Sequence, residues 1–200
     1  MIIFAGLICA CNSTDSKSNK SSASRLLPEP DIIDRLKYQK QIIDTLINLN
    51  KDKLIVLAKL TNNSVPIIIN NGNFPDNVDI TYNIFKDSLG HILTISELPF
   101  SESGDWNIIL THYFDNTGKT FAFERQSIFF NSICTDGVAY ESKTDFYDRD
   151  FKLIDKMYIL ADEKNKPLQR DNCQFPYDFK YNVSADINRY LQMNRIKNSR

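Results

Sequence analysis

The two histidines, His91 and His112, are the side chains of this sequence whose ordinary pKa lies closest to neutral pH. Both lie in stretches of alternating apolar residues, on the side that the alternation predicts to be buried. A single histidine on an apolar face is more often a hydrogen-bonded core residue than a catalytic base. A small hydrolase that pairs His112 with a Ser or Asp partner therefore stays open as an alternative, and we assign no catalytic residue.

A polar loop between two predicted strands offers chemistry of another kind. Ser101, Glu102, Ser103 and Asp105 carry hydroxyl and carboxylate groups, and Trp106, the only tryptophan of the chain, closes the loop. An aromatic ring beside such groups is a common composition at binding sites. We therefore take these five residues as a candidate binding loop. The alternative is that Trp106 only fills the core.

A strand-like run followed by Asp, two residues and a turn residue occurs four times, starting at Asp87, Asp115, Asp148 and Asp162. Asp at the first position of a turn accepts hydrogen bonds from backbone amides two residues on. Gly or Asn at the fourth position adopts the left-handed conformation that short hairpin loops require. Phe151 takes that place in the third copy, so we expect this turn to differ in geometry. Calcium needs six to eight converging oxygens, and no calcium-loop spacing is present, so we predict turns and no metal site.

Cys134 and Cys173 are the cysteines of the main part of the chain. In an exported protein such a pair is most simply a disulfide. It would close a loop of about forty residues and contribute about 4 kcal/mol in the chain-entropy model. It would also pin the segment after the last hairpin to the strand entry near Ser132–Asp136. This entry lies in the loop 131–137, which we consider a further candidate functional loop. Two free thiols, or a reactive thiol paired with His112, are the alternatives.

The overall composition excludes several classes of function. The net charge is -1, and basic residues alternate with acidic ones, so we expect no nucleic-acid partner. The sequence has no Gly-rich phosphate loop, HExxH, CxxC or GxSxG motif, and we expect no cofactor. Hydrophobic residues make up 42% and aromatic residues 12%, which indicates a folded domain rich in strands.

The spacing of apolar residues predicts the elements that position these groups. We expect an amphipathic helix over 31–49, a second helix over 54–60 with a strand as the alternative, and a short strand over 65–70 whose Pro66 marks an edge or a strand start. Further strands are expected over 78–86, 91–97, 106–114, 119–130, 138–147 and 151–161, with a weak strand near 167–170. A closing helix that Ser184 caps is expected over 185–196. Residues 151–161 are apolar on both faces, so we expect a central strand there.

Alternation also predicts which side chains share a face of the sheet. It places Leu93 with Ile95, and Phe121 with Phe123. The predicted fold class is α+β, with an antiparallel β-meander sheet of about six to eight strands. One or two N-terminal helices and a short C-terminal helix would pack against this sheet.

The N-terminus has the features of a targeting segment. Residues 1–11 are almost wholly apolar and too short to span a bilayer, and residues 12–24 form a Ser-rich polar tether. The junction Leu7-Ile8-Cys9-Ala10-Cys11 resembles the lipobox of bacterial lipoproteins. The resemblance implies a signal peptide over 1–10, acylation of Cys11, a tether over 11–30 and a single domain over 31–200. A buried N-terminal strand or helix is the alternative, which the polar tether disfavours.

This resemblance also implies a location and one partner. Asn12 after the cysteine implies the outer membrane, with the membrane bound through the lipid anchor. The sequence therefore predicts a non-enzymatic binding or structural module of the bacterial envelope, whose protein or small-molecule partner is unknown. The alternatives are the hydrolase that uses His112 and an inhibitor or immunity-type protein.

Overall fold

The computed structural model describes residues 31–130, 132–175 and 177–197. The predicted signal peptide, Cys11 and the tether lie outside the described residues. The elements are α1 (Ile32–Leu49), a 3-10 turn (Lys51–Lys53), β1 (Ile55–Leu60), β2 (Ile67–Ile68), β3 (Val78–Lys86), β4 (Ile92–Pro99), β5 (Trp106–Phe114), β6 (Thr120–Phe129), β7 (Ala139–Tyr147), β8 (Leu153–Asp162), a 3-10 turn (Arg170–Asn172) and α2 (Ile187–Met193).

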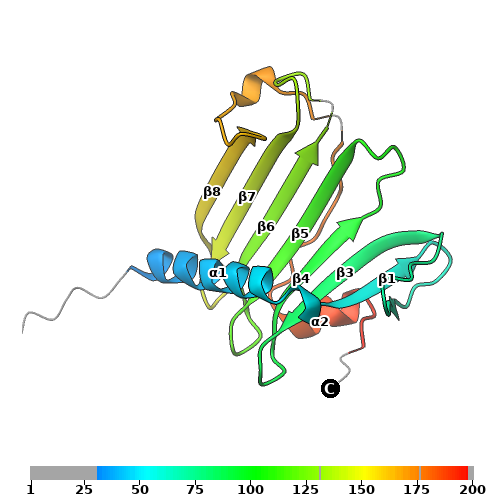
Figure 1. Ribbon diagram of the computed structural model, residues 1–200. Helices are drawn as coiled ribbons and strands as arrows, with labels where there is room; N and C mark the ends of the chain where they lie inside the picture. The colour runs from blue at the N-terminus through cyan, green and yellow to red at the C-terminus, as the bar shows by residue number, and fades with distance from the viewer. Residues whose placement is uncertain (1–30, 131, 176, 198–200) are drawn as a thin grey trace, which may run out of the picture.

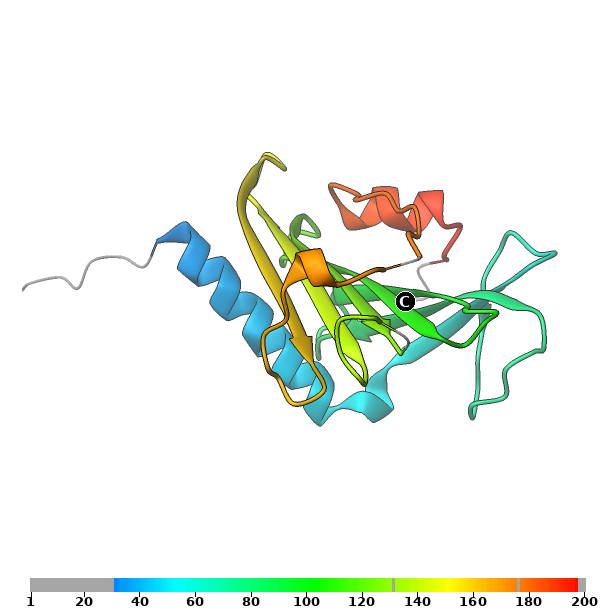
Figure 2. The same ribbon diagram turned by 90° about the horizontal axis from the view of Figure 1, so that it is seen from above.

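The described strands form one antiparallel sheet in the order β2-β1-β3-β4-β5-β6-β7-β8. Helix α1 lies across one face of this twisted sheet, and α2 lies against the opposite face (Figure 1 and Figure 2). The predicted α+β class, with a meander sheet between an N-terminal and a short C-terminal helix, is confirmed. Residues 173–175 and 177–186, which we call the C-terminal strap, lead from the far end of the sheet to α2.

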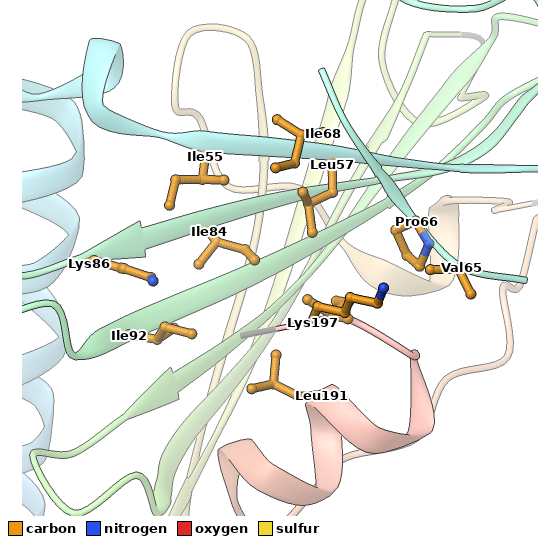
Figure 3. Close-up of a pocket in the computed structure, with 11 residues that line it drawn as sticks. Ile55, Leu57, Val65, Pro66, Ile68, Ile84, Lys86, Ile92, Leu191 and Lys197 are labelled. Atoms are coloured by element: carbon orange, nitrogen blue, oxygen red, sulfur yellow. The ribbon is translucent and has the colours of Figure 1, made fainter. Parts of the chain in front are cut away.

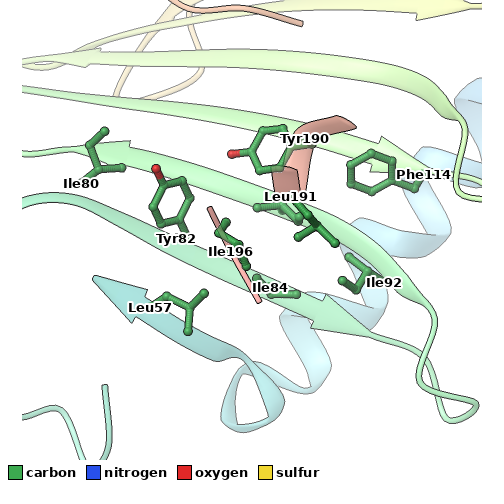
Figure 4. Packing of buried hydrophobic residues seen from close by; sticks show 10 residues of the cluster. Leu57, Ile80, Tyr82, Ile84, Ile92, Phe114, Tyr190, Leu191 and Ile196 are labelled. Atoms are coloured by element: carbon green, nitrogen blue, oxygen red, sulfur yellow. The ribbon is translucent and has the colours of Figure 1, made fainter. Parts of the chain in front are cut away.

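Each helix buries an apolar side against its own face of the sheet. On α1, Ile43 is buried, and Leu36 and Ile47 are partly buried, in one cluster with Tyr113 and Phe146 of the sheet. On α2, Tyr190 and Leu191 are buried in a second cluster on the other face (Figure 4). A third cluster lies beneath the strap and is built on β5 and β6. The core is therefore divided between the two faces of a single sheet.

All four Asp turns have the same hydrogen-bonded geometry. In each turn, the Asp carboxylate accepts from the amides two and four positions after the Asp. The amide three positions after the Asp, at the fourth position of the turn, donates to the Asp backbone carbonyl. The fourth residue has a left-handed φ of 87° at Gly90, 80° at Gly118, 61° at Phe151 and 61° at Asn165. The expectation that Phe151 changes the third turn was therefore wrong. The hydrogen bonds to Asp148 fix the backbone, and Phe151 adopts the conformation that they impose.

A β-bulge follows the turn in three of the hairpins. The register shifts by one residue next to the cross-strand pairs Phe85 and Thr94, Tyr113 and Ala122, and Phe146 and Asp155. The extra, unpaired residue lies on the second strand of each hairpin and is Leu93, Phe121 and Ile154 in turn. All three extra side chains pack in the cluster beneath α1. A bulge reverses the alternation of faces.

The bulges correct two predicted pairs of neighbours. Leu93 does not share a face with Ile95, which packs in the cluster beneath α2. Phe121 does not share a face with Phe123, which packs beneath the strap. The bulges thus turn three apolar side chains toward α1 that regular strands would have placed on the opposite face.

Three other expectations, on residues 55–60, on the last strand and on His91, need correction. Residues 55–60 form the strand β1 and not a second helix, because Ile55 and Leu57 pair with β3. The strand over 153–162 is an edge strand of the sheet, since the segment after it makes only the isolated bridge Ala161–Pro167. His91 is exposed, and its Nδ1 donates to the Asp87 carboxylate at 2.9 Å.

The cap of α2 also differs from the prediction. Asp186, and not Ser184, caps the helix, and its carboxylate accepts from the amide of Arg189 at 2.9 Å. The predicted disulfide between Cys134 and Cys173 is confirmed, with the two Cα atoms 4.6 Å apart. It fastens the start of the strap to the loop after β6, as the spacing of the cysteines led us to expect.

Candidate functional site

An apolar pocket lies between the β1–β2 edge of the sheet and the end of the chain (Figure 3). Its volume is about 240 Å³. The pocket is lined by nine apolar residues and two lysines, namely Ile55, Leu57, Val65, Pro66, Ile68, Ile84, Ile92, Leu191, Ile196, Lys86 and Lys197. Among the described lining residues there is no hydroxyl, thiol, imidazole or carboxylate side chain, so the described lining is suited to contact with an apolar ligand.

The floor of the pocket follows from the register of the strands. Ile55 pairs with Ile84, and alternate residues of β1 and β3 point to the same face of the sheet. The edge strand β2 pairs with β1 through Leu57 and Ile68. The loop before β2 brings Val65 to the side of the pocket, as Figure 3 shows.

The far wall depends on how α2 ends. Arg195 has a left-handed φ of 53°, its amide donates to the carbonyl of Gln192 at 3.2 Å, and the amide of Ile196 donates to the carbonyl of Leu191 at 2.9 Å. This is a Schellman motif, in which an apolar contact between the two outer residues is common. Leu191 and Ile196 make such a contact within the core cluster (Figure 4). The Arg195 guanidinium also donates to the Ser64 hydroxyl, which ties the chain end to the loop before β2.

Two lysines belong to the lining of the pocket. Lys86 lies at the end beside Ile84 and Ile92, and Lys197 reaches toward Val65 and Pro66 (Figure 3). Beneath α2, the hydroxyl of Tyr190 donates to Glu97 at 3.1 Å. Burial raises the pKa of the Glu97 carboxyl, although this hydrogen bond opposes the shift. Among the described residues, the pocket lining includes these two lysines and no carboxylate.

The predicted binding loop lies elsewhere. Ser101 accepts a hydrogen bond from the amide of Gly104 at 3.1 Å, and Glu102 is exposed. Asp105 accepts from Ser103 and, at 3.1 Å, from the hydroxyl of Tyr177 in the strap. Serine and tyrosine donors hold the pKa of the Asp105 carboxyl below its usual range.

Trp106 fastens the same loop to the strap. It is half-buried, its ring lies 5.5 Å from that of Tyr177, and it packs against the cluster beneath the strap. None of the five predicted loop residues lines the apolar pocket. The loop and the strap are thus joined by two contacts, one polar and one aromatic, which both involve Tyr177.

His112 is part of the core. It is 2% exposed, and Nε2 accepts from the amide of Ser184 at 3.1 Å. The rings of Phe114, Phe123 and Tyr190 surround it, and its Nδ1 is buried without a partner among the described residues. Burial lowers the pKa of the His112 imidazole to about 3. A neutral, enclosed imidazole that is bonded to a backbone amide does not provide the base that the hydrolase alternative needs.

A buried polar cluster fastens α1 to the sheet. Lys40 lies 2.9 Å from Glu124 and 2.9 Å from Asp44. The single proton of the Tyr113 hydroxyl is shared between Asp44 at 2.7 Å and Glu124 at 3.1 Å, and Ser142 donates to Glu124 at 2.7 Å. Burial alone would raise the pKa of Glu124, but Lys40 and the two hydroxyls hold it below its usual range. Burial alone would lower the pKa of Lys40, but the two carboxylates raise it.

The sequence did not indicate this cluster or the apolar pocket. Lys40 follows the helical spacing of polar residues, and nothing local marks it as buried. Ile55 and Leu57 do alternate with period two, which is the signal for a strand, but the short run also fits a helix. Ile196 and Lys197 join the pocket only because the Schellman motif turns the chain back.

Comparisons with known proteins gave no relative. No protein-family model, curated protein sequence or solved structure matches this chain. Within the described ranges, no three or more His, Cys, Asp or Glu side chains gather as they would to hold a metal ion. No helix in the same ranges is both long enough and apolar enough to cross a membrane.

Proposed function

We propose that this chain is a non-enzymatic binding module of the bacterial envelope, held at the outer membrane by a lipid on Cys11. We further propose that the pocket between β1, β2 and α2 binds an apolar chain that ends in an anionic group. The observation that carries the ligand class is the lining of nine apolar residues together with Lys197, with no acidic side chain among the described lining residues.

Physical chemistry supports this ligand class. Burial of apolar surface contributes roughly 25 cal/mol per Å². An ammonium group about 4 Å from an anion adds roughly 1–4 kcal/mol, depending on its exposure to water. The pocket volume of about 240 Å³ is below the roughly 300–1,000 Å³ of sites for drug-sized ligands. A single short acyl chain with a carboxylate therefore fits better than a large ring system.

The location rests on the N-terminal resemblance and on the disulfide. The lipobox-like junction that ends at Cys11 supports lipid anchoring. The Cys134–Cys173 bond supports an oxidising compartment, where disulfides persist. Labelling of cells with an alkyne palmitate analogue tests the anchor directly. The full chain should incorporate the label, and the Cys11→Ser variant should not.

Binding of decanoate tests the pocket. The chain from residue 25 onward contains every described residue, and its amide spectrum can be followed by nuclear magnetic resonance during titration. We expect saturable shifts with decanoate and weaker binding of decanol, because the alcohol has no charge for Lys197. Equal binding of both compounds would contradict the proposed role of Lys197.

A matched pair of variants separates the pocket from general hydrophobic adsorption. Ile68 and Ile159 lie on the two edge strands of the sheet and are similarly exposed, at 56% and 51%. Only Ile68 lines the pocket. Ile68→Trp should block decanoate, whereas Ile159→Trp should leave it unchanged. Loss of binding in both variants, or in neither, would argue against this site.

A further inference from the structure

A second cleft, on the same face of the sheet but under the C-terminal strap, has a different chemistry. It has a volume of about 290 Å³ and lies between β6, β7, the 3-10 turn at 170–172 and the strap. Arg125, Lys143 and Arg170 bring three positive charges to it, and Glu141 and Asp178 bring two negative charges. We call it the strap cleft.

The strap cleft contains an unfavourable charge arrangement within the sheet itself. Arg125 of β6 is directly opposite Lys143 of β7, on the same face. Like charges in directly opposite positions destabilise a pair of strands. Arg125 is only 9% exposed, and burial of a charge is costly unless the charge is compensated. An anion close to Arg125 and Lys143 would compensate these two positive charges.

The protein supplies that anion only in part. Asp178 lies 3.1 Å from Nη1 of Arg125, but the Asp178 side chain is 84% exposed, so water screens the pair. The Nε of Arg125 is buried and has no hydrogen-bond partner among the described residues. A buried donor without an acceptor costs about 1–3 kcal/mol. Arg125 therefore retains unused capacity to donate.

The other carboxylate of the strap cleft already has several partners. Glu141 is 3.0 Å from Nζ of Lys143, accepts from Tyr158 at 3.0 Å and lies 3.6 Å from Nε of Arg170. Since Glu141 is shared among these groups, it does not compensate Arg125.

Aromatic rings complete the walls. The guanidinium of Arg170 lies 4.6 Å from the ring centre of Phe175, and its Nη1 donates to the carbonyl of Cys173 at 2.9 Å. The disulfide holds Cys173 in place. Tyr177 lines the cleft and is bonded to Asp105 and packed on Trp106. The predicted binding loop thus supports a wall of this cleft without lining it.

From these observations we propose that the strap cleft binds a small oxyanion, a carboxylate or a phosphate group, with Arg125 as its main donor. A planar guanidinium can bind either group through two parallel hydrogen bonds. The bound anion would give the Arg125 guanidinium a second acidic partner beside Asp178 and relieve the repulsion between Arg125 and Lys143. This site is separate from the apolar pocket and does not depend on the function proposed for it.

Titration of the chain from residue 25 onward with sodium phosphate and with sodium acetate, at constant ionic strength, tests the proposal. Amide shifts should saturate and be largest around Arg125 and Arg170. The two salts together show whether phosphate or carboxylate is the better fit. Absence of saturable shifts with both salts would overturn the proposal.

Three substitutions distinguish a binding site from a structural ion pair. Arg125→Gln should weaken the binding of the better anion at least about tenfold, in line with the loss of a charged hydrogen bond, and should leave the unfolding midpoint in anion-free buffer equal or higher. Asp178→Asn removes the competing carboxylate and should strengthen binding. Arg149→Gln, an exposed control on a turn outside the cleft, should change neither quantity. Unchanged binding in Arg125→Gln, or a lower midpoint in both cleft variants, would show a structural ion pair instead.

The pocket variant provides the last control. Ile68→Trp should block decanoate and leave the response to phosphate and acetate intact. A loss of both responses would show that the two sites are not independent and would overturn this assignment.

Discussion

The ring of Phe151 stacks on the ring of Tyr147 with 4.5 Å between centroids, although the backbone of Phe151 has the left-handed conformation that glycine adopts in the first two hairpins. A bulky residue rarely takes this conformation. Here the hydrogen bonds to Asp148 impose the turn, and the stack on Tyr147 offsets part of the strain. Phe151 also packs against the cluster beneath the strap, so the third turn is joined to the core.

Replacement of Phe151 should separate the strain from the stacking. Phe151→Ala and Phe151→Gly both remove the ring, but only glycine adopts a φ of 61° without the penalty of roughly 1–2 kcal/mol that a side chain causes. We expect both variants to be less stable than the natural chain, and the glycine variant to be the more stable of the two by about 1 kcal/mol. Urea denaturation measures this difference. Equal stability of the two variants would mean that the turn is not strained.

The hairpins also show which features of the fold the sequence could predict and which it could not. Asp87, Asp115, Asp148 and Asp162 predicted four turns because the Asp–amide bonds are local. The bulges could not be predicted, because a one-residue shift depends on the partner strand and leaves no mark on the composition. The edge position of β8 could not be predicted for the same reason. Apolar residues on both faces of a strand do not show whether another strand pairs with its outer side.

The candidate sites were harder to predict than the fold. The apolar pocket joins residues 55–68 with residues 191–197, and the strap cleft joins Arg125 with Arg170 and the strap. Neither group of residues is contiguous or regularly spaced, so no motif marks it. The disulfide was predictable because the main part of the chain has two cysteines, Cys134 and Cys173, which allow one pairing between them. The composition of the loop 101–106 predicted a binding loop, but its residues contact Tyr177 of the strap cleft without lining the cleft.

The disulfide should contribute strongly to stability. Cys134 and Cys173 are 39 positions apart, and a loop of that size is worth about 4 kcal/mol in the chain-entropy model. We expect the Cys134→Ser/Cys173→Ser double variant to unfold at a markedly lower urea concentration. Addition of a reductant should lower the midpoint of the natural chain and leave that of the double variant unchanged. A reductant effect on the double variant would point to another source of the loss.

The contact between Lys40 and Glu124 should be the main polar attachment of α1. Lys40→Met leaves Glu124 buried without its cation, and removal of one partner of a buried pair costs about 3–5 kcal/mol. Lys37→Met is a matched control on the same helix, because Lys37 pairs with Asp155 at 2.8 Å in a partly exposed position. An exposed pair is worth about 1 kcal/mol or less.

A third variant tests whether the cost comes from the unpaired charge. Lys40→Met/Glu124→Gln removes both charges, so it should recover much of the stability that Lys40→Met loses. Urea midpoints of the three variants provide the comparison. If the double variant is no more stable than Lys40→Met, the aliphatic stem of Lys40 matters more than its charge.

The buried His112 should make the protein sensitive to mild acid. Its pKa is about 3 in the folded chain and 6.5 as the ordinary value, so between these values the unfolded chain binds a proton that the folded chain does not. Stability therefore falls as the pH drops below 6.5, by about 2 kcal/mol between pH 7 and pH 5 from this group. His112→Gln keeps an acceptor for the amide of Ser184 and should lose this part of the pH dependence, whereas the exposed His91→Gln control should retain it. Urea denaturation at the two pH values gives the comparison, and an equal decrease in His112→Gln and in the natural chain would rule out His112 as the source.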